Sequence, residues 1–347
     1  MIRLGIAGIG FMGMVHYLTY QKIRGVKVAA ICEQDPQRLS GDWRGIQGNF
    51  GPKGKRMDLA DVTAYSELDD LIADDSLDLI DITLPPSLHA DIAVQALNAG
   101  KHVFCEKPMA LNLIECRRMT KAAERAGKLL MIGHVLPFFP EYAWALKTVE
   151  SGDYGKLLGG SFKRIISDPT WLKNYWDATQ IGGPMLDLHV HDAHLIRLLF
   201  GKPKGVVSHG RMRNGLAERW NTQFIYGPRG PTVHAASGVI HQQARPFDHG
   251  FEIYLEGATL TFEFAVHGSK GVHLCEPTLF SDVTSKRVKL TSDDPMEAFQ
   301  AEIKEVLRCV RQSAHSPLLN TKLAQDAILM CHKQTESLQT GRTAKLK

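Results

Sequence analysis

Short apolar runs alternate with amphipathic helical patterns through the first third of the chain. Apolar runs of this length, with helices between them, are typical of parallel strands that are buried on both faces of a sheet. One helix is predicted at residues 88–98 and another at 113–126, the second opened by Asn112 and closed by Gly127, which are usual start and stop residues. The predicted strands are residues 4–7, 26–32, 77–83, 101–104 and 129–132.

The pattern changes beyond residue 133. Alternating apolar and polar positions joined by Gly and Pro turns predict an open, mostly antiparallel sheet. Its strands are expected at residues 157–166, 205–212, 220–226, 232–240, 251–255, 259–264 and 288–290, and helices at 141–150, 184–200, 296–311 and 322–340. Residues 41–62 are rich in Gly and charge and too long for an ordinary connection, so we interpret them as a surface insertion.

Composition narrows the classes of protein. The 347 residues exceed the length at which one core usually stops growing, so we expect two domains. The net charge of +4 is spread without a basic stripe, which argues against a nucleic-acid partner. Six cysteines without a Cys-x-x-Cys pair indicate neither a disulfide framework nor a zinc ribbon and favour a cytoplasmic location. No leader or apolar span is visible, so no membrane association is expected.

A glycine-rich turn follows the first predicted strand. Gly8, Gly10 and Gly13 are spaced for a tight turn, a close approach to a pyrophosphate and helix packing, in front of a helix N-terminus that attracts anions. Glu33 ends the second predicted strand, where a carboxylate accepts hydrogen bonds from ribose and repels a 2′-phosphate. These residues favour a dinucleotide-binding loop over a plain structural turn, and they favour NAD as the cofactor. The neighbouring Arg38 leaves NADP possible.

Several separated motifs add to this turn. They are the Gly8 to Gly13 loop with His16, the run Leu84-Pro85-Pro86-Ser87-Leu88-His89, the triplet Glu106-Lys107-Pro108, the segment from Gly182 to Asp192, Phe299 to Ile303, and Thr340-Gly341-Arg342. In this order, over nearly the whole chain, they resemble the Gfo/Idh/MocA family of oxidoreductases, which includes glucose-fructose oxidoreductase and inositol dehydrogenase. The resemblance implies an N-terminal Rossmann dinucleotide-binding domain (residues 1–133) and a C-terminal α+β domain for substrate binding and oligomerisation (134–347), within the α/β class.

The resemblance also implies site residues. The catalytic set is Lys107, Asp187 and His191. The cofactor-binding residues are Gly8, Gly10, Phe11, Met12, Gly13, Glu33, Leu84, Pro85, His89, Glu106 and Lys107.

The catalytic residue types fit alcohol oxidation chemically. Asp187 and His191 are four apart and share one face of the predicted helix. His191 is suited to accept the hydroxyl proton, Asp187 to orient the imidazole, and Lys107 to stabilise the alkoxide. An ordinary surface pair at this spacing is the alternative. A metal is not expected, because His189 and His191 point about 200° apart on a helix.

The sequence departs from the family after the last strand of the first domain. The family often has Asn and Arg there, whereas this chain has Gly133-His134-Val135, so His134 becomes a candidate substrate contact. An aromatic segment at residues 171–177 precedes the predicted helix and offers a stacking surface for a sugar ring, with core packing as the alternative. The further candidate substrate-binding residues are Trp171, Lys173, Trp176 and His194.

The leading hypothesis is an NAD(P)-dependent dehydrogenase or reductase acting on a secondary alcohol or ketone of a sugar, cyclic polyol or glycoside. The resemblance leaves two alternatives: an enzyme that retains NAD and cleaves a glycoside through transient oxidation, and a catalytically silent regulator that binds the dinucleotide. The presence of Lys107, Asp187 and His191 argues against the regulator. The family's open sheet commonly pairs between subunits, so a homodimer or homotetramer is expected.

Overall fold

The computed structural model describes residues 1–48, 51–172, 174–290, 292 and 294–346. The chain divides into two compact units, residues 1–138 with 294–325, and residues 139–293 with 326–347. The first unit thus includes a late segment, 294–325, which the sequence pattern had grouped with the C-terminal domain.

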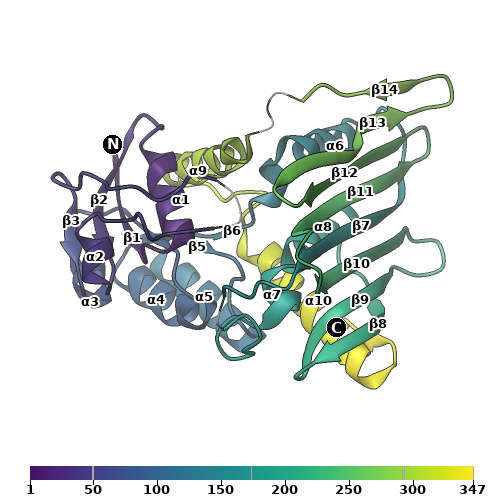
Figure 1. Ribbon diagram of the computed structural model, residues 1–347. Helices are drawn as coiled ribbons and strands as arrows, with labels where there is room; N and C mark the ends of the chain where they lie inside the picture. The colour runs from purple at the N-terminus through teal and green to yellow at the C-terminus, as the bar shows by residue number, and fades with distance from the viewer. Residues whose placement is uncertain (49–50, 173, 291, 293, 347) are drawn as a thin grey trace. The chain divides into compact units, whose positions relative to one another are not determined.

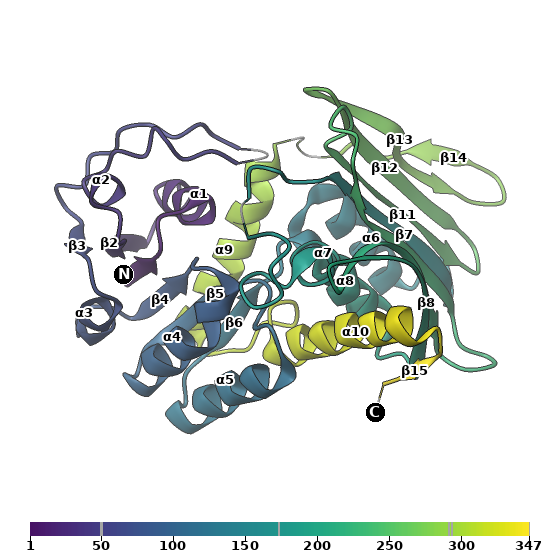
Figure 2. The same ribbon diagram turned by 60° about the horizontal axis from the view of Figure 1, so that its bottom comes forward.

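Within the described part of the first unit, six parallel strands form a sheet in the order β3-β2-β1-β4-β5-β6. The strands are β1 Ile2–Ala7, β2 Val26–Cys32, β3 Thr63–Tyr65, β4 Leu79–Ile82, β5 His102–Glu106 and β6 Leu130–Gly133. The helices are α1 Phe11–Tyr20, α2 Pro36–Leu39, α3 Leu68–Ala73, α4 Pro86–Asn98, α5 Leu113–Ala126 and α9 Pro295–Gln312, with a 3-10 turn η1 at Leu136–Phe138. Helices α1 and α9 cover one face of the sheet, and α4 and α5 cover the other (Figures 1 and 2). This strand order is that of a Rossmann fold, as predicted.

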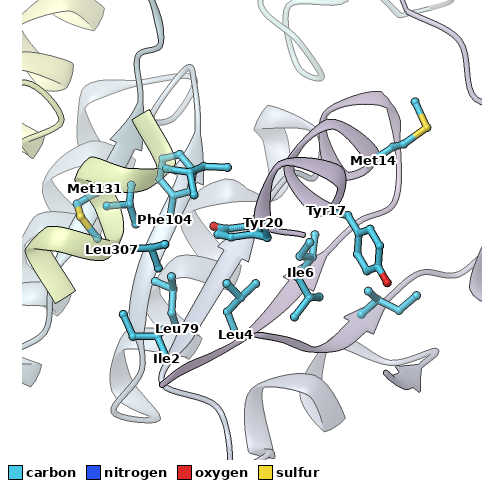
Figure 3. Packing of buried hydrophobic residues seen from close by; sticks show 14 of the residues in the cluster. Ile2, Leu4, Ile6, Met14, Tyr17, Tyr20, Leu79, Phe104, Met131 and Leu307 are labelled. Carbon is cyan, nitrogen blue, oxygen red and sulfur yellow. The ribbon is translucent and has the colours of Figure 1, made fainter. Parts of the chain in front are cut away.

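Helix α9 joins the first unit because its apolar stripe completes that unit's core. Leu307 on α9 lies with Leu4 of β1, Tyr20 of α1 and Phe104 of β5 in one buried cluster (Figure 3). Each fully buried side chain of this size contributes about 1.5–3 kcal/mol. Without α9, the sheet face beside α1 would expose these side chains to water.

The insertion between β2 and β3, predicted to be at the surface, has mostly exposed or half-buried residues but is anchored in the core by a few buried side chains. Trp43 is fully buried, packs edge-on against Tyr17 of α1 at a centroid distance of 4.9 Å, and donates its indole N–H to the Arg38 carbonyl at 2.8 Å. Ile46 is buried in the same cluster. A side chain at Gly48 would collide with the Phe11 ring, so this part of the insertion lies against the start of α1.

In the described residues of the second unit, nine strands form one sheet in the order β14-β13-β12-β11-β7-β10-β9-β8-β15. Neighbours are antiparallel except for β7 and β10, which confirms the predicted mostly antiparallel sheet. The strands are β7 Leu157–Ser167, β8 Gly205–Arg213, β9 Leu216–Ile225, β10 Thr232–Ile240, β11 Phe247–Leu255, β12 Thr259–His267, β13 Lys270–Phe280, β14 Ser285–Arg287 and β15 Ala344–Lys345. The helices are α6 Pro140–Ser151, α7 Gly183–Asp187, α8 Val190–Phe200 and, from residue 326 onward, α10 Thr321–Thr340, whose first turn belongs to the first unit.

One face of this sheet carries the helices (Figure 1). Tyr142 of α6 packs against Phe251 of β11, and the Ser337 hydroxyl of α10 accepts the backbone N–H of Ser208 on β8 at 2.9 Å. No helix among the described residues is both long and apolar enough to cross a membrane.

Two predicted elements are wrong. Residues 184–200 form two helices, because the chain turns at Leu188 and His189. The backbone N–H of His189 bonds to the Pro184 carbonyl, five residues back, at 3.0 Å, which opens the turn beyond normal α-helical spacing. Residues 288–290 are not a strand. The sheet continues instead through β13 and β14; β14 is entirely polar, and apolar and polar positions do not alternate regularly along β13.

Candidate active site

The glycine-rich turn has the geometry of an anion site. Gly8 has a φ of +94°, and a Cβ on Gly13 would lie 2.1 Å from the Gly8 carbonyl oxygen, so a side chain fits poorly at either position. Gly10 precedes α1 and has open space where a side chain would point. Because the N-cap residue Gly10 has no side chain to cap the amides at the start of α1, the turn suits the pyrophosphate of a dinucleotide. Phe11 and Met12, both half-buried, form the first turn of α1.

Glu33 directly follows β2 and reaches the glycine-rich turn. Its Oε2 accepts the backbone N–H of Ile9 at 2.9 Å, and its Oε1 accepts the N–H of Asp35 at 3.0 Å. Arg38 lies beside it, with Nη1 3.9 Å from Oε2. The carboxylate is therefore fixed at the predicted ribose position, with one cation next to it.

The His89 ring lies between the loops after β4 and β5. Its ring is fully buried, with Nε2 2.8 Å from the Leu84 carbonyl and Nδ1 2.9 Å from the Pro108 carbonyl. Burial lowers the pKa of His89. Leu84 in turn packs against Gly8, and Pro85 precedes α4. The neutral ring has one N–H and donates to one of the two carbonyls, so the predicted cofactor residue His89 packs between the two loops in the interior.

Lys107 follows β5 and is half-buried. Its backbone N–H donates to Oε2 of Glu106 at 3.2 Å, and the Lys107–Pro108 peptide is cis. Glu106 is buried and has Oε1 3.2 Å from Nε2 of His16, so this predicted cofactor residue is engaged with the interior. His134, just after β6, is also buried.

Asp187 and His191 belong to the second unit, on two helices rather than the single helical face that was predicted. Asp187 is the last residue of α7, and His191 is the second residue of α8. Both are half-buried. Burial raises the pKa of Tyr175, and the charges of Asp187 and Asp168 raise it further, so Asp187 lies near the predicted aromatic segment.

That segment is held by residues which the sequence analysis missed. The Trp176 indole N–H donates to Oδ1 of Asp168 at 2.9 Å, and the Arg213 guanidinium, which also bonds to Asp168, lies 4.3 Å from the centre of the Trp176 ring. Asp168 and Arg213 are 45 residues apart, and no local pattern pairs them. Trp171 is 56% exposed, as a stacking surface requires.

The remaining predicted contacts differ in their surroundings. His194 is fully buried, and Lys173 lies outside the described residues. Among the described residues, no three His, Cys, Asp or Glu side chains are grouped as metal ligands. None of the six cysteines forms a disulfide.

An ion pair fixes the first turn of α8. Arg164 of β7 donates from Nε to Oδ2 of Asp192 at 2.6 Å and from Nη2 to Oδ1 at 3.2 Å. Both side chains are buried. Because Asp192 directly follows His191, the pair fixes the backbone that carries the predicted base.

Comparison with known proteins matches both units. Residues 2–134 match "Oxidoreductase family, NAD-binding Rossmann fold", and residues 142–272 match "GFO/IDH/MocA C-terminal domain". The inositol 2-dehydrogenase of Salmonella typhimurium is 31% identical over 159 residues, 45% of this chain and 44% of that protein. A glycosyl hydrolase family 109 protein of Shewanella pealeana is 29% identical over 191 residues, 52% of this chain and 41% of that protein.

The chain therefore aligns with less than half the length of these two relatives. A solved structure of levoglucosan dehydrogenase in complex with NADH and levoglucosan has the same fold, with a TM-score of 0.80, 18% identity, and 99% of each chain covered.

Proposed function

This chain belongs to the GFO/IDH/MocA family of NAD-binding oxidoreductases, and we propose that it transfers hydride between NAD(P) and a secondary alcohol or ketone. The proposed substrate is a sugar, cyclic polyol or glycoside. The observation that carries the proposal is the glycine-rich turn at the start of α1, with the Glu33 carboxylate fixed on the Ile9 amide.

The first unit supplies the proposed cofactor contacts. The amides at the start of α1 bind the pyrophosphate, and Glu33 accepts hydrogen bonds from the adenosine ribose. When bound, the nicotinamide accepts or returns the hydride. NADP remains a second proposed cofactor, because Arg38 lies beside Glu33 and an arginine there can bind a 2′-phosphate.

The proton steps belong to three side chains in this proposal. His191 takes the hydroxyl proton at its ring nitrogen, because imidazole titrates near neutral pH. Asp187 stabilises the charged ring, and the Lys107 ammonium stabilises the alkoxide oxygen. The proposed substrate contacts are His134, Trp171, Lys173, Trp176 and His194. The exposed Trp171 ring supports stacking against a sugar ring, as do relatives named for inositol and levoglucosan.

A substrate panel tests the proposal. Purified protein is mixed with sugars, cyclic polyols and glycosides, and NADH absorbance is followed. His191→Ala should abolish turnover while NAD still binds by calorimetry, and Lys107→Met should lower turnover strongly. His315→Ala, an exposed histidine in the connection after α9, is the matched control and should behave like wild type. Retained turnover in His191→Ala would overturn the assignment.

The glycoside-cleaving alternative has support from the glycosyl hydrolase family 109 relative. It predicts sugar release without added NAD and without accumulation of NADH. Stoichiometric NADH would exclude it, and the absence of both products across the panel would favour a regulator.

We further propose that the first unit binds the dinucleotide, and that the second binds substrate and a second subunit through the helix-free face of its sheet. A cytoplasmic homodimer or homotetramer is proposed, with the unpaired cysteines supporting a reducing compartment. Sedimentation velocity tests the assembly, and a monomer across the micromolar range would contradict it.

A further inference from the structure

Four ionisable side chains meet in the interior of the first unit. They are His16 of α1, Asp81 of β4, Glu106 of β5 and Glu302 of α9, named here the buried acid cluster. His16, Asp81 and Glu302 are fully buried, and Glu106 is 7% exposed. Charged groups are rarely buried without partners, because removing a charge from water is unfavourable whereas burying an apolar group is favourable. Three acids around one base in a core therefore require an explanation.

The contacts of His16 indicate its charge. Nδ1 lies 2.9 Å from Oδ2 of Asp81, and Nε2 lies 3.2 Å from Oε1 of Glu106. A neutral imidazole has one N–H and would turn a lone pair toward one of these two carboxylates, so their charges favour the doubly protonated ring. Burial alone would lower the pKa of His16, but Asp81 and Glu106 raise it well above its ordinary value. The ring is also stacked on Phe104 at 5.3 Å, which fixes its plane.

Glu106 connects this cation to Lys107. One carboxylate oxygen faces His16, and the other accepts the backbone N–H of Lys107. Gly133, paired with Glu106 across β5 and β6, leaves room for the carboxylate, since a Cβ there would lie 3.1 Å from Oε1. The Lys107 backbone is thus held by a carboxylate that is itself held by His16.

Glu302 completes the cluster as a neutral acid. Its oxygens have no hydrogen-bond partner among the described residues. Burial raises the pKa of Glu302 well above its ordinary value, and the charge of Glu106 raises it further. Tyr20 also faces the cluster, and burial together with Asp81 raises its pKa. The charges that remain are those of Asp81, His16 and Glu106, so a single cation is shared by two carboxylates.

We propose that His16 is a positioning residue for Lys107, acting through Glu106, which it holds in the orientation that fixes the Lys107 backbone. This inference rests on the proposed function, in which Lys107 stabilises the alkoxide.

The first test follows the Lys107 amide and needs no substrate. His16→Gln and Glu106→Ala should each speed hydrogen exchange of that amide roughly tenfold or more, because the acceptor is released in the first variant and removed in the second. Glu302→Gln is the matched control, since a neutral amide replaces a neutral acid, and exchange should stay within about twofold. Unchanged exchange in His16→Gln would overturn the proposal.

The second test is kinetic. His16→Gln should lower kcat roughly 10–100-fold, because a displacement of ~1 Å at a reacting group has effects of this size, while NAD affinity changes much less. If His16 acts through Glu106, the double variant loses no more than the worse single variant. Multiplying losses would show independent roles and overturn the proposal.

A third measurement uses the wild-type protein, so it can be made even if the variants do not fold. The His16 ring, observed by NMR with labelled histidine, should remain doubly protonated at about pH 8, where an ordinary histidine is neutral. A neutral ring at that pH would overturn the proposal. Full turnover in Lys107→Met would contradict only the proposed function, since amide exchange and ring protonation report on His16 independently.

Discussion

The Arg164–Asp192 pair should be one of the largest single contributions to stability in the second unit. The Arg164 side chain is 5% exposed and that of Asp192 1%, and two hydrogen bonds join them at 2.6 and 3.2 Å. Asp192→Asn keeps the size of the side chain but removes the charge. The Arg164 cation then stays in the core without its counter-charge.

The expected cost follows from the burial of both partners. Breaking one side of a buried, hydrogen-bonded ion pair costs about 3–5 kcal/mol, because the remaining charge is desolvated without compensation. For a domain of this size each kcal/mol lowers Tm by about 2–4 °C, so the transition should fall by about 6–20 °C. Replacing both residues by apolar ones, in Arg164→Met with Asp192→Leu, should recover most of the loss.

Differential scanning calorimetry is the assay, because the two units can unfold in separate transitions. Lys333→Ala is the control: it breaks an exposed pair with Glu336 on α10, which is worth at most about 1 kcal/mol. A Tm decrease of under about 2 °C in Asp192→Asn would refute the reasoning, because the pair would then contribute no more than a surface contact.

Four further predictions concern single sites. Gly13→Ala should lower Tm, since its Cβ would overlap a carbonyl oxygen, whereas Gly10→Ala, with open space there, should leave Tm unchanged. Glu33→Ala should weaken NAD binding and reduce the ratio of NAD affinity to NADP affinity in fluorescence titrations. If the wild-type protein binds NADP more tightly than NAD, the assignment is contradicted. Trp43→Ala should cost about 3–5 kcal/mol in urea unfolding, and a loss under about 1 kcal/mol would contradict its anchoring role. Burial lowers the pKa of His189 to about 4. The free energy of unfolding should therefore decrease from pH 6.5 to 4, because the unfolded chain takes up a proton that the folded chain does not. His189→Gln should reduce this dependence of the unfolding free energy on pH.

The sequence was most informative where burial and local signals agree. Helix α5 has the predicted bounds because Asn112 accepts the N–H of Glu115 and Gly127 has a φ of +62°, both of which are written in neighbouring residues. Strand β2 also has its predicted bounds, since a strand covered on both faces is apolar throughout. These elements depend on little beyond their own residues.

Prediction failed where distant residues decide the local structure. The break between α7 and α8 follows from His189, whose ring bonds to Ser237 on β10 at 2.8 Å and packs edge-on against Trp220 on β9. The helical pattern of residues 184–200 does not show that His189 has partners on these two strands. Helix α9 likewise joins the first unit because α1 offers it a face, which no pattern within 295–312 reveals.

The buried acid cluster shows the same limit at the proposed site. Lys107 was identified from a motif at a strand end, and Glu106 from its neighbourhood, but Asp81 lies inside a strand and reads as an ordinary polar position. His16 and Asp81 are 65 residues apart and meet only because β1, β4 and α1 pack together. The motif therefore places Lys107 directly after a strand, but it does not reveal the His16–Asp81 pair that lies behind Glu106. The tertiary structure supplies this pair. In the proposed arrangement, one oxygen of the Glu106 carboxylate holds the Lys107 backbone, and His16 holds the other oxygen.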